Sequence, residues 1–263
     1  MEFAQFTLDP ILRWLHILAG IVWIGHLYFF NFVNGPFAAT MSPDTKKAVV
    51  PELMPRALYF FRWGAAWTWI TGVLLLGLLY HYGMVMAGGT GGAGTLGTLT
   101  AITLTFAGFT VYDAIQSSSI FNDQKIKNAV CFVLVAMVTF IFSTYSGMGY
   151  RGYVIHVGAM FGTTMAFNVW FRIWPAQQKI ITAIKNGQAP DAALVGLAGL
   201  RSRHNTYMSA ALIWTMIESH TMGFLNGLPL FGTMPQIGML LMILVSWHVV
   251  FQLYRRAGQV KGF

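Results

Sequence analysis

The chain has 263 residues, of which 56% are hydrophobic and 9% are charged, and its mean hydropathy is +0.60. An ordinary soluble domain is about 25% charged, so this composition excludes a typical soluble protein. The single cysteine, Cys131, excludes an intrachain disulfide and a cysteine-rich zinc or iron–sulfur site.

Seven continuous apolar runs have about the 20 residues that cross a bilayer as a helix. They lack the alternating pattern of a transmembrane β-barrel. The predicted fold is therefore all-α, a polytopic bundle of seven transmembrane helices in which residues 1–263 form a single integral membrane domain. The expected spans are 11–33, 57–80, 96–121, 127–148, 152–174, 205–226 and 236–257.

Basic residues predict the orientation of these spans, because positive charge marks the cytoplasmic side. Of the 16 Lys and Arg residues, all but Arg13 and Arg151 lie in the segments 34–62, 122–127, 172–203 and 255–263. The N-terminus is thus expected outside and the C-terminus inside. The net charge of +8 follows from this topology. It favours contact with anionic membrane lipid, and no nucleic-acid partner is expected.

Two cytoplasmic connections are expected to contain helices. Ser42 precedes Pro43, which predicts an N-cap followed by proline at the first helical position. The segment 176–185 carries isoleucines on one face, and Asn186-Gly187 predicts its end. We expect this segment to lie along the membrane surface.

Three histidines are predicted in the outer half of the membrane: His16 in the first span, His156 in the fifth and His220 in the sixth. At ~1.5 Å per residue they all lie roughly 5–10 Å outside the midplane, and Glu218 lies at a similar depth. Three imidazoles at one level could ligate a haem or a non-haem metal. Alternatively, each ring forms hydrogen bonds between helices.

Two arginines accompany these histidines. Arg13 lies one turn outward from His16, and Arg151 lies just outside His156. They stand where haem propionates would emerge, although arginines that reach for the interface would give the same pattern. Glu218 is included with them among the candidate cofactor-binding residues.

A second polar group is expected toward the cytoplasm, and it could hold another haem, form a proton path or fix helix packing. Within this group, Arg62 is the nearest predicted partner of Asp113. His81 lies outside the group and is expected at the outer interface in contact with water. His204 and His220 are 16 residues apart, about 24 Å along one helix, so they cannot share a small site. The members of this group are His26, Arg62, Asp113, Asn168, His204 and His248.

The pattern of these residues resembles the membrane domain of the bacterial urate hydroxylase (membrane-bound uricase) family. The similarity extends over nearly the whole chain, and the part from 150 to 220 is the most specific. It is carried by Arg13-Trp14-Leu15-His16, Trp23-Ile24-Gly25, Met54-Pro55, Thr68-Trp69, Ile155-His156-Val157-Gly158-Ala159-Met160, Asn168-Val169, Pro190-Asp191, Arg201-Ser202-Arg203-His204-Asn205 and Ser219-His220.

The resemblance implies a multi-pass protein of the bacterial inner membrane that oxidises urate and passes electrons to cytochrome c. It supports His16, His156, His204 and His220 as metal-ligand positions, whereas His26 stands where the family pattern has a small hydroxyl residue. Members of the family continue into a C-terminal cytochrome c domain. This sequence ends after the seventh span, so we expect the acceptor to be a separate cytochrome c or another redox subunit.

Two functions from different classes remain open. The first is a membrane oxidoreductase that passes electrons through a histidine-ligated haem b, with catalytic residues not identified. The second is a non-catalytic or electron-carrying subunit of a larger respiratory or photosynthetic complex. A proton-coupled transporter is a weaker alternative, because the sequence shows no repeat with broken helices.

Overall fold

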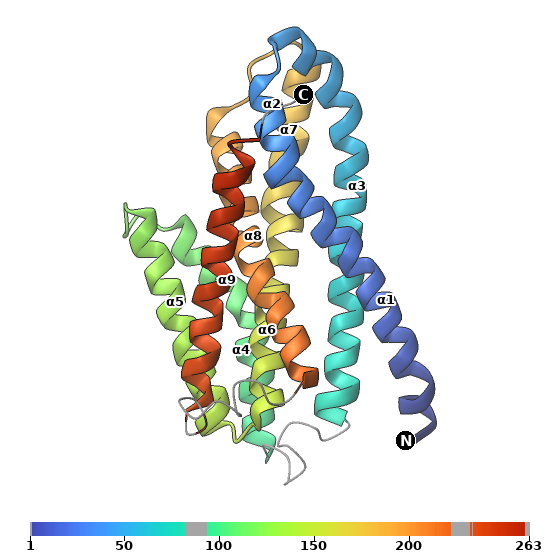
Figure 1. Ribbon diagram of the computed structural model, residues 1–263, viewed down its shortest axis with the longest axis vertical. Coiled ribbons are helices and arrows are strands. Elements are labelled where there is room, and N and C mark those ends of the chain that lie inside the picture. Colours follow the sequence, from blue (N-terminus) through green and yellow to red (C-terminus); the bar gives the residue numbers. More distant parts are fainter. Residues whose placement is uncertain (1, 83–93, 222–231, 233, 261–263) are drawn as a thin grey trace. The chain divides into compact units, whose positions relative to one another are not determined.

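The computed structural model describes residues 2–82, 94–221, 232 and 234–260, and all regular structure in this part of the chain is helical (Figure 1). The all-α prediction is therefore confirmed. The elements in chain order are α1 (Glu2–Tyr28), η1 (Phe29–Asn34), α2 (Gly35–Thr40), α3 (Pro43–Leu76), η2 (Gly77–Tyr82), α4 (Gly94–Ser117), α5 (Gln124–Phe140), η4 (Ile141–Tyr145), α6 (Tyr150–Asn168), η5 (Val169–Ile173), α7 (Trp174–Lys185), α8 (Ala192–Thr221) and α9 (Pro235–Ala257), where η marks a π-helix.

Within the described residues, six helices are long and apolar enough to cross a membrane. Each overlaps one of the predicted spans, namely the first five and the last, with bounds that differ from the predicted ones. The remaining prediction, 205–226, is helical as far as Thr221 in α8, and its last residues lie outside the described part of the chain. The six helices are Thr7–Thr40, Pro43–His81, Gly94–Ser117, Gln124–Tyr145, Tyr150–Lys185 and Pro235–Ala257.

The N-cap predicted before α3 is confirmed. The Thr45 backbone N–H donates to Ser42 Oγ at 3.2 Å, and the helix begins at Pro43. From there α3 continues without a break into the apolar span, although Pro51 and Pro55 lie inside it. The helix thus starts 14 residues before the predicted span 57–80, because hydropathy locates the membrane segment and not the helix end.

The segment 176–185, predicted to be a helix on the membrane surface, is helical, but protein covers its apolar face. Helix α7 follows α6 and η5 without a break, and Ile180 packs with Ala176 against Ala198 of α8. The apolar face is therefore covered by protein, and the prediction of a helix lying on lipid is wrong. Its predicted end is right: Gly187 takes a φ of +72°, which favours glycine, directly after α7.

The chain divides into two compact units. Unit 1 comprises Met1–Asp9, Gly72–Thr164 and Ala211–Ser246, and unit 2 comprises Pro10–Thr71, Met165–Ala210 and Trp247–Phe263. The single membrane domain and the orientation with the N-terminus outside stay predictions.

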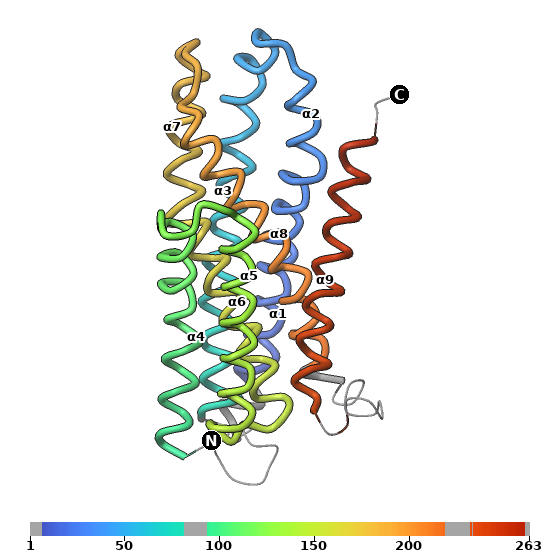
Figure 2. The backbone as a smooth tube through the Cα atoms, turned by 90° about the vertical axis from the view of Figure 1, so that its left-hand side faces the viewer, coloured from blue at the N-terminus to red at the C-terminus, as the bar shows by residue number. Residues whose placement is uncertain are grey.

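Unit 1 contains an antiparallel pair of helices, α4 and α5, which lie side by side in both views (Figures 1 and 2). The turn between them is closed by Lys127, whose Nζ donates to the carbonyl oxygens of Gln116 at 3.0 Å and Ser118 at 2.7 Å. A lysine at this position stabilises the C-terminal end of α4, where carbonyl groups lack helical partners.

Unit 1 also contains a close contact between α6 and α8. A Cβ added at Gly158 would overlap Thr215 Oγ1 and lie 3.0 Å from Thr215 Cβ, whereas a Cβ at Gly162 would meet Leu212 at an ordinary 3.9 Å. Small residues four apart allow two membrane helices to approach closely, and here Gly158 provides the tight part of the contact.

Unit 2 is held by a close approach of α1 and α3 and by hydrogen bonds among α1, η1, α8 and α9. A Cβ at Gly64 would lie 3.0 Å from the backbone nitrogen of Trp23, whose side chain is buried. Three hydrogen bonds join segments distant in sequence: Asn31 Nδ2 to Ser202 Oγ at 2.8 Å, Tyr254 Oη to Asn31 Oδ1 at 2.8 Å and Ser209 Oγ to Tyr28 Oη at 3.0 Å.

Candidate functional site

Two histidines face each other in unit 1. His156 of α6 is 0% exposed, His81 of η2 is half-buried, and their Nε2 atoms are 3.1 Å apart. The ring centroids are 5.1 Å apart and the ring planes are nearly perpendicular, at 86°. The prediction that water surrounds His81 is therefore wrong, and its place at the outer interface stays a prediction.

The backbone fixes the tautomer of His156. Its Nδ1 lies 2.7 Å from the Gly152 carbonyl oxygen. A carbonyl only accepts a hydrogen bond, so Nδ1 carries the proton, and the neutral ring directs its Nε2 lone pair toward His81. His81 lies in the π-helix η2, which follows α3 and extends two residues past the predicted end of the span at residue 80.

Aromatic rings enclose the His156 imidazole. The Tyr80 and Phe142 rings lie edge-on to it, at centroid distances of 6.0 and 5.9 Å, and both side chains are buried. His81 Nδ1 is also buried and has no hydrogen-bond partner among the described residues. The two imidazoles thus meet beside buried aromatic side chains.

A buried carboxyl group lies in the same unit. Glu218 of α8 is 1% exposed, and Tyr150 Oη donates to its Oε1 at 2.9 Å. Tyr153, one turn before His156 on α6, packs its ring 5.4 Å from that of Tyr150. Glu218, predicted from sequence to contact a cofactor, is thus held by a tyrosine hydroxyl.

In unit 2, His16 of α1 is bound to α3. Its Nδ1 lies 2.9 Å from the Thr68 carbonyl oxygen and 3.1 Å from Thr71 Oγ1. The carbonyl again requires the proton on Nδ1, so the neutral ring keeps an Nε2 lone pair. Metal-bound histidines commonly show this arrangement, with the distal N–H donated to a backbone oxygen.

The other histidines of unit 2 are held differently. His26 Nδ1 lies 2.7 Å from the Val22 carbonyl oxygen on its own helix, and its ring stacks 6.1 Å from Phe60. His248 is exposed, with its Nε2 3.1 Å from Gln252 Nε2. His204, at a predicted ligand position in the first half of α8, is half-buried.

Arg62, predicted to pair with Asp113, lies over the Trp174 ring at 4.1 Å, and its carbonyl oxygen accepts from Trp170 Nε1 at 3.1 Å. This cation–π contact accounts for a guanidinium group among apolar residues. Its pairing with Asp113 stays a prediction.

The outer trio of histidines was expected to share one site. His156 belongs to unit 1, His16 belongs to unit 2, and the side chain of His220 lies outside the described residues. Arg13 and Arg151 are both half-buried. Across the described residues, no group of three or more His, Cys, Asp or Glu side chains is placed to hold a metal ion, and the shared site stays a prediction.

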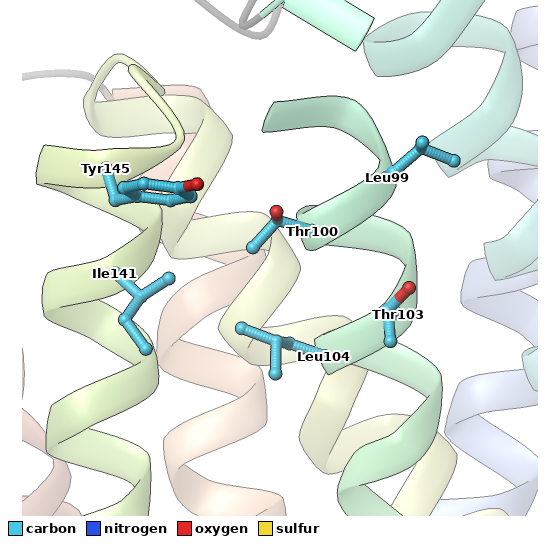
Figure 3. A pocket seen from close by; sticks show the side chains of 6 residues that line it. All are labelled: Leu99, Thr100, Thr103, Leu104, Ile141 and Tyr145. Atoms are coloured by element: carbon cyan, nitrogen blue, oxygen red, sulfur yellow. The ribbon is translucent and has the colours of Figure 1, made fainter. Parts of the chain in front are cut away.

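An apolar groove lies on unit 1 (Figure 3), with a volume of about 610 Å³. Ile141 and Tyr145 of η4 face Thr100 and Leu104 of α4 across it. Its lining has no charged side chain. In a membrane protein an open apolar surface of this kind is suited to lipid, and we assign it no catalytic role.

Comparison with known protein families gives one match. The family model described as "Urate oxidase N-terminal" matches residues 40–255, and this range includes His81, His156 and Glu218. His16 precedes the matched range. Comparisons with curated proteins and with solved structures gave no match. Because the match covers well over half of the chain, the protein belongs to the urate oxidase N-terminal family.

Proposed function

We propose that the chain is a membrane-bound oxidoreductase of the bacterial cytoplasmic membrane that oxidises urate and passes the electrons to a separate cytochrome c. The observation that carries the proposal is the family match over residues 40–255. The six apolar helices support a membrane location for the reaction. A protein in this membrane can deliver electrons to a carrier at its surface without oxygen as the direct acceptor.

A b-type haem is the proposed redox group, and His16 would hold it through its Nε2 atom. The imidazole is oriented by the Thr68 carbonyl and the Thr71 hydroxyl, and its Nε2 lone pair remains for a metal. A haem bound there would supply one-electron transfer. Arg13, three residues earlier on α1, is the proposed partner of a propionate.

His156 and His81 would not hold a haem between them. Two imidazoles on opposite sides of one iron have nitrogens about 4 Å apart, twice the roughly 2.0 Å of a metal–imidazole bond. The Nε2 atoms of His81 and His156 are 3.1 Å apart, so an iron porphyrin cannot stand between them. We therefore propose His16 as the haem ligand, and His204 and His220 stay predicted ligand positions.

The haem proposal predicts the optical spectrum of one variant. We expect the purified wild type to show a b-type signal in its reduced-minus-oxidised spectrum and His16→Ala to lose most of it, because the variant lacks the ligand. His248→Ala removes an exposed histidine that contacts Gln252, and it should retain the full signal. A wild type with no extractable haem, or a His16→Ala protein with an unchanged spectrum, would contradict this assignment.

A further inference from the structure

We propose that His81 and His156 together bind a divalent transition-metal ion through their Nε2 atoms, at a site separate from any haem. Neither the urate activity nor the haem is needed for this proposal. It rests on the geometry of two imidazoles brought together from η2 and α6 within unit 1.

The distance between the two nitrogens fits two ligands of one ion. Imidazole nitrogens at 2.0–2.1 Å from an ion are about 2.9 Å apart when the angle at the metal is 90°, and about 3.4 Å apart at the tetrahedral angle. The observed Nε2–Nε2 distance of 3.1 Å lies between these values. The two rings therefore need little movement to accept an ion.

The orientation of His156 also fits a ligand. Its Nδ1–H donates to the Gly152 carbonyl oxygen, which leaves the Nε2 lone pair of the neutral ring for an ion. Carbonyl groups play this orienting role at many metal-bound histidines. His81 lies in the π-helix η2, which follows α3, and π-helical turns within α-helices are frequent at functional sites.

The two imidazole groups indicate which kind of ion would bind and which kind of ligand would complete its coordination. Imidazole suits Zn²⁺, Cu²⁺, Ni²⁺ and Fe²⁺, whereas Mg²⁺ and Ca²⁺ prefer oxygen ligands. Two neutral imidazoles leave the ion its full charge, so a water molecule or an anionic ligand is expected at the remaining positions. Within the described residues, no group of three acidic, cysteine or histidine side chains is placed for one ion.

An N–H···N hydrogen bond between the rings is the alternative, and His81→Gln distinguishes the two. A glutamine retains an N–H that can donate to His156 Nε2 but is a poor ligand for these ions. We expect chelator-treated wild type to bind one equivalent of Cu²⁺ with an electron paramagnetic resonance pattern of two coupled nitrogens. His81→Gln should lose that pattern and bind at least about tenfold more weakly.

Two controls keep the outcomes separable. His248→Gln, at an exposed histidine, should bind Cu²⁺ as the wild type does. His16→Ala should keep the copper signal even where it loses haem, so failure of the haem proposal is distinguishable from failure of this one. If wild type and His81→Gln bind Cu²⁺ equally, the pair is a hydrogen bond only. If His81→Gln does not fold, a wild-type spectrum without the two-nitrogen pattern overturns the site.

Discussion

Replacing Gly158 by alanine is expected to lower the free energy of unfolding by about 1–3 kcal/mol, the usual cost of overpacking a tight contact. The new methyl group would overlap Thr215 Oγ1 and lie 3.0 Å from Thr215 Cβ. That hydroxyl donates to the Leu212 carbonyl oxygen at 2.7 Å, so its side chain cannot turn away freely. Thermal unfolding in detergent, followed by circular dichroism, measures the effect.

Gly162→Ala is the matched control, because it lies one turn away on α6 and its methyl group would meet Leu212 at 3.9 Å. There the loss of a helical glycine should stabilise the protein by roughly 0.5–1 kcal/mol. Thr215→Ala removes the overlapping hydroxyl and should recover part of the loss in the Gly158→Ala background. Equal unfolding temperatures for the two single alanine variants would show that α6 and α8 do not meet closely at Gly158.

Replacing Asn205 by alanine is expected to cost about 2–4 kcal/mol, because it removes two buried hydrogen bonds and leaves a small cavity. Asn205 is 0% exposed; its Oδ1 accepts from Asn168 Nδ2 at 2.9 Å and its Nδ2 donates to the Met165 carbonyl oxygen at 2.9 Å. The same unfolding measurement applies, and Asn128→Ala on the exposed surface of α5 should change stability by less than about 0.5 kcal/mol.

Asn205→Leu separates the two contributions, since leucine keeps the branched shape of asparagine, fills the site with a larger side chain and has no hydrogen-bonding group. A leucine variant as stable as the wild type would show that packing alone stabilises this contact between α6 and α8. We expect it instead to be clearly less stable than the wild type, although less affected than the alanine variant.

The membrane-spanning segments were predictable from sequence because crossing a bilayer requires about 20 apolar residues, and each span contains an apolar run of about that length. The starts of α3 and α8 were not predictable in this way, since α3 extends through polar sequence to Pro43 and α8 extends beyond the basic residues Arg201 and Arg203 to Ala192. The N-cap at Ser42 predicted the helix start itself, but hydropathy did not show that the same helix enters the membrane.

In the candidate site, some histidines were predictable from sequence but their partners were not. Histidines within apolar sequence mark positions that need a partner, and this rule identified His16 and His156. The partners were not predictable, because they depend on helix register. His81 was missed since a span ending at residue 80 placed it in water, whereas η2 turns it toward α6. Its aromatic neighbours, Tyr80 and Tyr82, were the available signal of a buried setting.

Anaerobic oxidation of urate by the purified chain, with oxidised cytochrome c as the acceptor, tests the proposed function most directly. Hydroxylation of urate with water releases two electrons and two protons, so we expect two molecules of cytochrome c to be reduced for each urate consumed. His16→Ala should abolish this reaction, whereas His248→Ala should support it at the wild-type rate. Folded, haem-loaded wild type that consumes no urate with cytochrome c or any other electron acceptor would contradict the account.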